Sequence, residues 1–328
     1  MAKTLLSLSP LPVSALKSLL NLAPGIADTE IIAAHDMSDE DLCKVFGKAD
    51  VVLGDFTFKR RIERDLLAKA GPLKLKLLQQ PSVGYEHIDI KACSERGIRV
   101  ANTPGANTVS VAEHTIAFGL AMLRKLIPAN RSVRAGQWEQ QTLHPHELQH
   151  KTWGIVGLGQ IGRDVAVRLK PFNLNKVLYY DVREAPRQVE VQCGVEYCDL
   201  KKLLISSDIV SLHAPATDSN RNMIGAAELS SMKEGAYLIN VARGSLVDET
   251  ALARALREGQ IAGAAIDVFP EEPAAATDPL LKVEEDKLLL SAHIAGVSTE
   301  SAGRIMIMAI ENIGRVLDGL DPLYIVNP

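Results

Sequence analysis

The sequence has few of the residues that would place it among disulfide-rich, metal-binding or membrane proteins. Its 328 residues include four cysteines, Cys43, Cys93, Cys193 and Cys198, and no two of them form a CxxC pair. That spacing indicates neither a zinc site nor a redox pair. No apolar run approaches the roughly 18 residues of a membrane span. The first residues, MAKTLLSLSP, also lack the apolar length of a signal peptide. We therefore expect a reduced, cytoplasmic environment and no membrane partner.

An excess of positive charge is also absent. The net charge is −4, and the tight basic run Lys59, Arg60 and Arg61 is explained by a solvated helix face. Without a basic surface, nucleic acid is not expected as a partner. The hydrophobic content of 47% and the charged content of 23% are those of a globular protein, and the length suggests about two domains.

Short β-rich runs alternate with helical patterns along the whole chain. Strands are predicted at 4–9, 30–35, 49–55, 75–82 and 99–103, and again at 152–157, 176–181, 208–215, 236–242, 263–269 and 287–293. Helices are predicted at 38–49 with Ser38 as N-cap, at 107–126 with few charges, and from about 298 to 320; 136–150 reads as a loop. This alternation predicts an α/β protein with two doubly wound parallel sheets. A cleft between the two domains, at the carboxyl ends of the strands, would bind ligands.

The stretch GIVGLGQIG contains a phosphate-binding pattern, Gly157-x-Gly159-x-x-Gly162. An apolar strand precedes it and an amphipathic helix follows it, which is the context that a dinucleotide-binding loop requires. Glycines allow a tight turn and a close approach of the pyrophosphate, and the helix N-terminus offers N–H groups to the phosphates. We predict a Rossmann-type cofactor domain whose loop contacts also include Gln160 and Ile161. A glycine-rich turn without a ligand is the alternative.

Asp181 ends the next predicted strand, about 20 residues after Gly162, where a carboxylate accepts both hydroxyls of the adenosine ribose. The same carboxylate repels a 2′-phosphate, so the sequence predicts NAD, with NADH preferred over NADPH. Arg183 weakens this preference, because a guanidinium can partner a phosphate.

Polar residues follow three later strands: Arg243, the pair Glu271–Glu272, and His293. Each has an ordinary explanation as a cap, a solvated turn or a core histidine. The carboxyl ends of parallel strands converge on one edge, however, so all three can face one nicotinamide. Arginine can hold a carboxylate by two hydrogen bonds. A histidine beside a carboxylate can give and take a proton near neutral pH. Together these groups predict a site that reduces carbonyls.

Six stretches carry a resemblance to a known family: SVGYEHIDI (82–90), GIRVANTPGANTVSVAEHT (97–115), GIVGLGQIGRDVA (154–166), INVARGSLVDETAL (239–252), AAIDVFPEEP (264–273) and AHIAG (292–296). On these stretches the chain resembles the D-isomer-specific 2-hydroxyacid dehydrogenase family, which includes phosphoglycerate, glyoxylate–hydroxypyruvate and D-lactate dehydrogenase-type enzymes. The resemblance implies an NAD-dependent oxidoreductase that interconverts a small 2-keto acid and its D-2-hydroxy acid by hydride transfer.

The resemblance also implies roles for individual residues. Arg243 would bind the substrate carboxylate and polarise the carbonyl, and His293 would be the acid in reduction and the base in oxidation. Glu272 would be the partner of His293, since the family places this glutamate directly before a proline, here Pro273. Backbone N–H groups at Val83 and Gly84 would also hold the substrate. The remaining predicted cofactor contacts are Ala214, Pro215, Val241, Ala242, Asp267, His293 and Gly296.

The family fold further implies a smaller, flavodoxin-like substrate-binding domain that is discontinuous and consists of 1–101 plus 298–328. The residues between these two parts, 102–297, would form the NAD-binding domain. A homodimer through the cofactor domain is expected at the family level, and the apolar 107–126 helix fits it. We expect no attached regulatory domain after Pro328.

Two departures from the family pattern stand out. Ala292 takes the place of a proline that usually precedes the histidine, which would loosen the backbone there. Asp55 lies where the family often holds phosphorylated substrates with basic or small polar residues, and it argues against 3-phosphoglycerate. Phe56 and Phe58 suggest an apolar wall for the substrate side chain.

Other readings stay open at this point. His144, His146 and His150 are spaced as metal ligands can be, but no cysteine or carboxylate set accompanies them, so no metal is predicted. His87, His114 and His213 are expected to be structural. A catalytically weak NAD(H)-sensing interaction protein of the corepressor type is the alternative function. A formate- or phosphite-oxidising relative is disfavoured, since formate enzymes of the family use glutamine where this chain has Glu272.

Overall fold

The computed structural model describes residues 3–20 and 29–327 and divides the chain into two compact units. One comprises Met1–Asn107 and Thr299–Pro328, the other Thr108–Ser298. The first boundary falls after Asn107, not after residue 101. Hydrogen bonds explain this, because the Asn102 N–H donates to the Tyr324 carbonyl (3.3 Å) and Arg304 Nε donates to the Ala106 carbonyl (2.8 Å).

The first unit alternates strands and helices, as predicted. Its elements are β1 (Lys3–Ser7), α1 (Val13–Leu20), β2 (Thr29–Ala33), α2 (Asp39–Phe46), β3 (Val51–Leu53), α3 (Arg64–Lys69), β4 (Leu77–Gln79), α4 (Ile90–Glu95), β5 (Arg99–Ala101) and α12 (Thr299–Leu317). Among the described residues, β2-β1-β3-β4-β5 form one all-parallel sheet. Ser38 caps α2 by accepting the Asp41 N–H at 3.1 Å, which confirms the predicted N-cap.

Side chains of the first sheet alternate between two hydrophobic cores, because successive residues of a strand point to opposite faces. Leu5 packs with Leu16 of α1 and Ile313 of α12 on one face. Leu6 packs with Phe46 of α2 on the other, where α3 and α4 also lie. The first unit is thus a three-layer α/β sandwich with the flavodoxin-like strand order.

The second unit begins with two helices and continues with a second alternation. Its elements are α5 (Thr108–Leu123), α6 (Leu126–Arg134), β6 (Thr152–Val156), α7 (Gln160–Leu169), β7 (Lys176–Tyr180), α8 (Arg187–Cys193), β8 (Glu196–Tyr197), α9 (Leu200–Ser206), β9 (Ile209–Leu212), α10 (Ala226–Ser231), β10 (Tyr237–Asn240), α11 (Glu249–Glu258), β11 (Gly263–Ile266) and β12 (Leu288–Leu290). Short 3-10 turns lie at Lys170–Phe172, Asp218–Asn220, Gly244–Leu246 and Pro279–Lys282.

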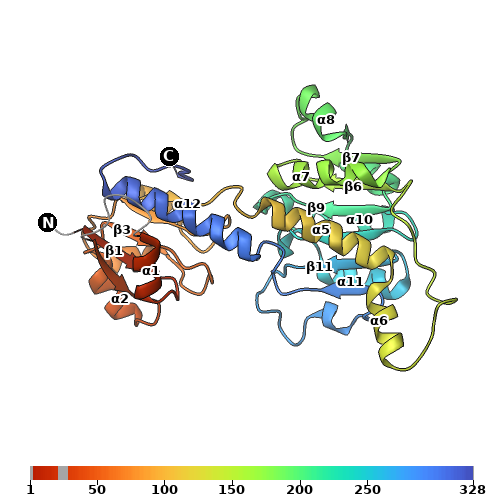
Figure 1. The fold of residues 1–328 in the computed structure, drawn as a ribbon, viewed down its shortest axis with the longest axis horizontal. Helices are drawn as coiled ribbons and strands as arrows, with labels where there is room; N and C mark the ends of the chain where they lie inside the picture. The colour runs from red at the N-terminus through yellow and green to blue at the C-terminus, as the bar shows by residue number, and fades with distance from the viewer. Residues whose placement is uncertain (1–2, 21–28, 328) are drawn as a thin grey trace. The chain divides into compact units, whose positions relative to one another are not determined.

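In the second unit, the described strands form one parallel sheet in the order β12-β11-β10-β9-β6-β7-β8. Strand order reverses between β6 and β9, and such switch points are where doubly wound sheets bind ligands. Helices α5 and α7 pack on one face around the fully buried Trp153, and α9, α10 and α11 cover the other (Figure 1).

The helix predicted at 107–126 corresponds to α5, which ends three residues earlier, and the helix after it, α6, was not predicted. Lys125 adopts a left-handed conformation (φ 53°), and α6 starts directly after it. Pro128 gives the reason: it lacks an N–H and its ring clashes with the carbonyl four residues back, so it fits only the first turn of a new helix. The two-residue strand β8 was not predicted. In the described part of the chain, every helix is too short or too polar to traverse a lipid bilayer.

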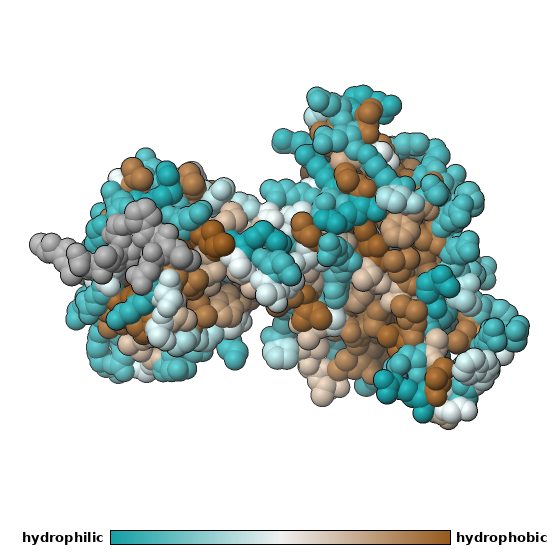
Figure 2. Space-filling view, in the orientation of Figure 1, coloured by the Kyte–Doolittle hydropathy of each residue, from teal (hydrophilic) through white to brown (hydrophobic). Residues whose placement is uncertain are grey.

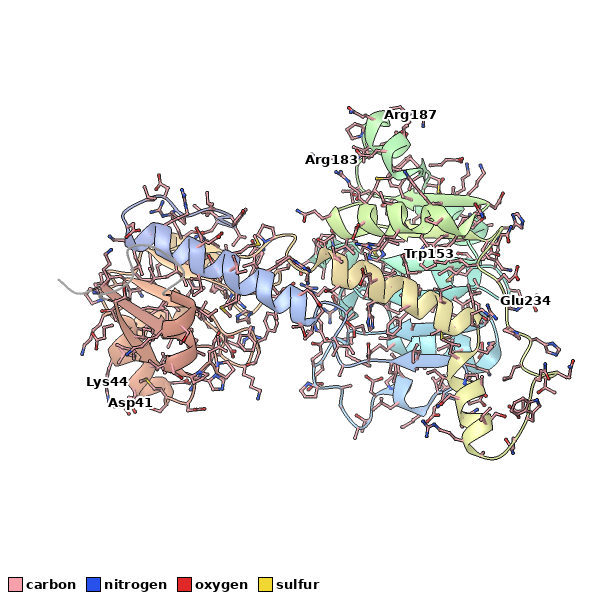
Figure 3. All side chains as sticks on the ribbon, in the orientation of Figure 1. Asp41, Lys44, Trp153, Arg183, Arg187 and Glu234 are labelled. Carbon is pink, nitrogen blue, oxygen red and sulfur yellow. The ribbon has the colours of Figure 1, made fainter. Side chains whose placement is uncertain are left out.

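The close packing of α5 on the sheet depends on Gly119. A Cβ there would lie 2.6 Å and 2.9 Å from ring atoms of Trp153, which lies in the centre of the unit (Figure 3). We expect Gly119→Ala to destabilise the protein by about 1–3 kcal/mol through overpacking, although alanine is the better helix former. The measurement is chemical denaturation followed by tryptophan fluorescence and circular dichroism.

Gly303 of α12 provides the matched control, because a Cβ there meets nothing within 4 Å. Gly303→Ala should be neutral or stabilise by up to about 1 kcal/mol. Equal effects of the two substitutions would contradict the packing argument.

Candidate active site

The glycine loop connects β6 to α7 at the switch point of the second sheet. Gly157 has φ 96°, a conformation that favours glycine, and its N–H donates to the Tyr180 carbonyl at 2.8 Å. A Cβ on Gly157 would lie 2.6 Å from Ala214 N, and a Cβ on Gly162 would collide with the Gly157 carbonyl. Both glycines are therefore needed for the close packing of the loop, the helix and the neighbouring strand end.

Gly159 differs from the other two glycines. It is the N-cap of α7, and a Cβ there would meet nothing within 4 Å. Gln160 and Ile161 open the helix behind it. Space above a helix N-terminus, with N–H groups pointing into it, suits a phosphate. The residues present therefore fit the pyrophosphate of a dinucleotide.

Asp181 directly follows β7, beside the same loop. Its Oδ2 accepts the Leu158 N–H at 2.8 Å, so the carboxylate braces the glycine loop. Within the described residues its Oδ1 has no hydrogen bond, which leaves one oxygen for a ribose hydroxyl. Arg183, two residues on, is exposed and lies beside α8 (Figure 3).

The other predicted cofactor contacts of this region lie at the ends of neighbouring strands. Ala214 and Pro215 follow β9, and Val241 and Ala242 follow β10 and are buried. Since β10, β9, β6 and β7 are adjacent and parallel, these residues and the glycine loop lie along one edge of the sheet.

His293 and Glu272 form a hydrogen-bonded pair, with 2.7 Å between Nδ1 and Oε2. His293 lies in the turn after β12, and Glu272 lies in the loop after β11, where its other oxygen accepts the Phe269 N–H at 3.0 Å. The two side chains are 41% and 37% exposed, so the pair is accessible to a ligand. Its hydrogen bond through Nδ1 leaves Nε2 as the ring nitrogen that can exchange a proton with a substrate.

The pair shifts the protonation of both partners. The hydrogen bond to Glu272 raises the pKa of His293 above its ordinary value, against burial and the positive charge of Arg243. Burial acts to raise the pKa of Glu272, but the hydrogen bond and charge of His293 outweigh it, so this pKa lies below the usual range. His293 is therefore a stronger base than a solvated imidazole and remains protonated to a higher pH.

Arg243 follows β10 and contributes its charge to the same region, since it acts on the pKa of both His293 and Glu272. Its Nη1 donates to the Ala242 carbonyl at 2.7 Å. The turn that presents it is closed by Asn240, a buried residue that donates to the Arg243 carbonyl (2.9 Å) and accepts the Ala242 N–H (3.1 Å). Asn240 was not predicted as a site residue, although a polar residue at the end of an apolar strand was the available signal.

Asp267 is fully buried directly after β11. Its carboxylate accepts the N–H groups of Ile294 and Ala295, both at 2.8 Å, and the hydroxyl of Ser291. A nicotinamide contact stays a prediction for Asp267, as it does for Gly296. The structure assigns the carboxylate a second set of partners within the turn that carries His293.

Val83 and Gly84 belong to the first unit, in the loop after β4. The Asn102 amide donates to the Val83 carbonyl (2.8 Å), and the Ser82 hydroxyl donates to the Gly84 carbonyl (2.6 Å). No hydrogen bond in the described chain uses the N–H of either residue. Both N–H groups are therefore available to a ligand, and their contact with a substrate carboxylate stays a prediction.

Further histidines of the described chain have surroundings of their own. His87 is buried against the Phe58 ring, and burial lowers its pKa. His213 bonds the Ser211 hydroxyl at 2.9 Å. His144, His146 and His150 are exposed, and among residues 3–20 and 29–327 no cluster of histidine, cysteine or acidic residues has a metal-binding arrangement.

Comparisons with known proteins agree with this geometry. Residues 116–295 match the family model described as "D-isomer specific 2-hydroxyacid dehydrogenase, NAD binding domain". A glyoxylate reductase of Thermofilum pendens is 40% identical over 90% of this chain and 88% of its own length. A D-3-phosphoglycerate dehydrogenase of Archaeoglobus fulgidus is 37% identical over 91% of this chain, which spans 55% of that relative. The D-lactate dehydrogenase of Aquifex aeolicus, solved with NAD and lactic acid, superimposes with a TM-score of 0.83 at 29% identity, covering 97% of this chain and 96% of its own.

The glycine loop, the matched NAD-binding domain and these relatives define the class of NAD-dependent oxidoreductases. Within that class, the chain belongs to the D-isomer specific 2-hydroxyacid dehydrogenase family.

Gly159 provides a test of the cofactor site. Because its Cβ position is open in the protein, Gly159→Ala should leave the melting temperature unchanged, yet the added methyl group would face the pyrophosphate. We expect NADH affinity to fall about tenfold or more, roughly 1.4 kcal/mol. Fluorescence titration with NADH measures it, with Gly303→Ala as the control. Unchanged affinity would place the dinucleotide elsewhere.

Proposed function

We propose that the protein interconverts a small 2-keto acid and its D-2-hydroxy acid, with His293 as the proton donor and acceptor. The observation that carries the proposal is the 2.7 Å hydrogen bond between His293 Nδ1 and Glu272 Oε2. The charge of Arg243 also acts on the pKa of His293. NAD(H), when bound, supplies or accepts the hydride.

Each residue has a distinct task in this proposal. His293 donates the proton from Nε2 to the carbonyl oxygen in reduction and takes it back in oxidation. Glu272 orients the ring and stabilises its charged form. Arg243 binds the substrate carboxylate and polarises the carbonyl, and the N–H groups of Val83 and Gly84 also bind the carboxylate. The first unit is then the substrate-binding domain and the second unit the cofactor domain.

The cofactor is proposed to be NADH in preference to NADPH. Asp181 supports this, because a 2′-phosphate would meet a carboxylate that the Leu158 N–H holds in place. Asp267 and Gly296 are proposed to lie at the nicotinamide end of the site.

The substrate is proposed to be an unphosphorylated 2-keto acid. Phe56 and Phe58 of the first unit are 37% and 38% exposed, and the Asp55 carboxylate between β3 and α3 is fully buried. Asp55 accepts hydrogen bonds from Thr57 and from the Arg60 N–H, so it stabilises the loop that presents the two rings. An apolar loop suits a hydrocarbon side chain better than a phosphate.

A homodimer through the second unit is proposed as well. Figure 2 shows apolar residues gathered over the face that carries α5 and α6. Leu126 and Val133 of α6 and Trp138 in the loop after it are 53%, 58% and 80% exposed, an unusual amount of apolar surface for one segment.

The cytoplasmic location stays a prediction, consistent with four cysteines that form no disulfide. Neither the relatives above nor the described residues offer an observation in favour of the sensing protein.

The test of the proposed function is a kinetic screen of about a dozen 2-keto acids with NADH and NADPH, in the wild type and in His293→Asn. Asparagine tolerates the left-handed conformation of His293 (φ 53°) but cannot transfer the proton. We expect kcat to fall about 100- to 10,000-fold with NADH affinity little changed. His144→Ala, in an exposed loop of the same unit, is the control. Near-wild-type turnover by His293→Asn would refute the mechanism.

The Glu272–His293 bond predicts the pH dependence. Reduction needs protonated His293, so its rate is full below the raised pKa and is lost as pH rises through it. In Glu272→Gln the pKa of His293 falls, which moves this basic limb to lower pH and reduces kcat about 10- to 100-fold. Profiles of kcat against pH in both directions measure the shift. A limb at the wild-type position would show that Glu272 does not set the pKa.

A further inference from the structure

The turn after β12 holds His293 in a conformation that its residue type does not favour. His293 has φ 53°, in the left-handed region that L-residues with a side chain rarely adopt. The residue before it is Ala292, so no proline ring restricts the backbone at Ser291. Other contacts must therefore hold the turn, or His293 would relax and leave Glu272.

Asp267 supplies those contacts. Three successive N–H groups of the turn end on this one residue: His293 donates to its carbonyl (2.7 Å), and Ile294 and Ala295 donate to its two carboxylate oxygens (2.8 Å each). The side chain is fully buried. A buried carboxylate depends on such donors, since it has lost its hydration.

Ser291 also bonds the Asp267 carboxylate. Its hydroxyl donates to Asp267 Oδ1, the same oxygen that accepts the Ile294 N–H. The Ser291 oxygen also lies 3.4 Å from Nε2 of His114 on α5. A hydroxyl has one proton, so with that proton on Asp267 the Ser291 oxygen can only accept from His114. The bonds therefore run in one direction, from His114 through Ser291 to Asp267.

His114 suits the role of a fixed donor. Its ring packs edge-on against Phe118, with 4.3 Å between the ring centroids. Burial lowers its pKa, although the charge of Asp267 opposes this, which favours the neutral ring that can carry its proton on Nε2.

We propose that Ser291 is a positioning residue: seated between His114 and Asp267, its hydroxyl fixes the buried carboxylate against the Ile294 and Ala295 N–H groups and so keeps His293 at Glu272. The proposal rests on the proposed role of His293 as the proton carrier. Ser291 itself touches neither His293 nor Glu272 through a described hydrogen bond, and it acts through Asp267 and the backbone.

Ser291→Ala tests the proposal, with Ser291→Thr as the conservative variant that keeps the hydroxyl. The control is Ser231→Ala, which removes one hydroxyl bond of the same unit, to the Glu228 carbonyl at the end of α10. The readouts are kcat and KM for a 2-keto acid that the wild type reduces, the position of the basic limb of the kcat profile, and the melting temperature.

We expect Ser291→Ala to lower kcat about tenfold or more, because a displaced catalytic group loses its alignment. The basic limb should also move to lower pH, because a loosened His293 loses part of its bond to Glu272. The charged groups that act on His293 are Glu272, Arg243 and Asp267, and all of them remain in every variant. Ser291→Thr should retain the wild-type limb and most of kcat, and Ser231→Ala should retain both.

The outcomes separate this proposal from the proposed function. If Ser291→Ala keeps kcat and the wild-type position of the basic limb while His293→Asn is inactive, the positioning role is wrong and the proposed function stands. The same conclusion follows if the melting temperature is the one property that Ser291→Ala changes. If His293→Asn keeps its rate, both are wrong. Should Ser291→Ala not fold, Ser291→Cys replaces it, since a thiol is a weaker donor and should give the same changes in smaller size.

Discussion

Parallel pairing of the strands is the constraint on which the second unit depends. Each described strand of its sheet runs in the same direction, so all the carboxyl ends lie along one edge. The glycine loop follows β6, Asp181 follows β7, Arg243 follows β10, Asp267 follows β11 and Ser291 follows β12. Residues far apart in the chain therefore share one edge, as the ligand sites of doubly wound sheets require.

The edge needs hydrogen bonds that the sheet itself does not provide. Beyond the strand ends the backbone leaves its ladder, and side chains take over: Asp181 accepts the Leu158 N–H, Asn240 closes the turn before Arg243, and Asp267 binds the turn of His293. Each of these side chains forms hydrogen bonds with backbone groups that have no neighbouring strand to pair with. The loops of the site are thereby held without regular secondary structure, and their side chains keep fixed directions.

Much of this arrangement was predictable from local pattern. Alternating apolar runs identified the strands, and Ser38 was correctly placed as a helix cap, because both signals depend on neighbouring residues alone. Helix α6 was not predicted; it begins directly after Lys125, whose left-handed conformation separates it from α5. Arg243, Glu272 and His293 were proposed as site residues because each follows a strand or matches the family. Ser291, Asn240 and the backbone contacts of Asp267 were not, since their importance comes from partners elsewhere in the chain.

The sequence by itself determined the class of fold, and it indicated the glycine loop and the polar side chains at the strand ends as the candidate site. These follow from periodicity and spacing, which are properties of short segments. Only the tertiary structure decided that Glu272 and His293 meet at 2.7 Å, that His293 adopts a left-handed conformation, and that Asp267 is fully buried beneath it. Those features arise where β11, β12 and α5 pack together, and side-chain bonds between separate elements require the folded chain to bring their partners within reach.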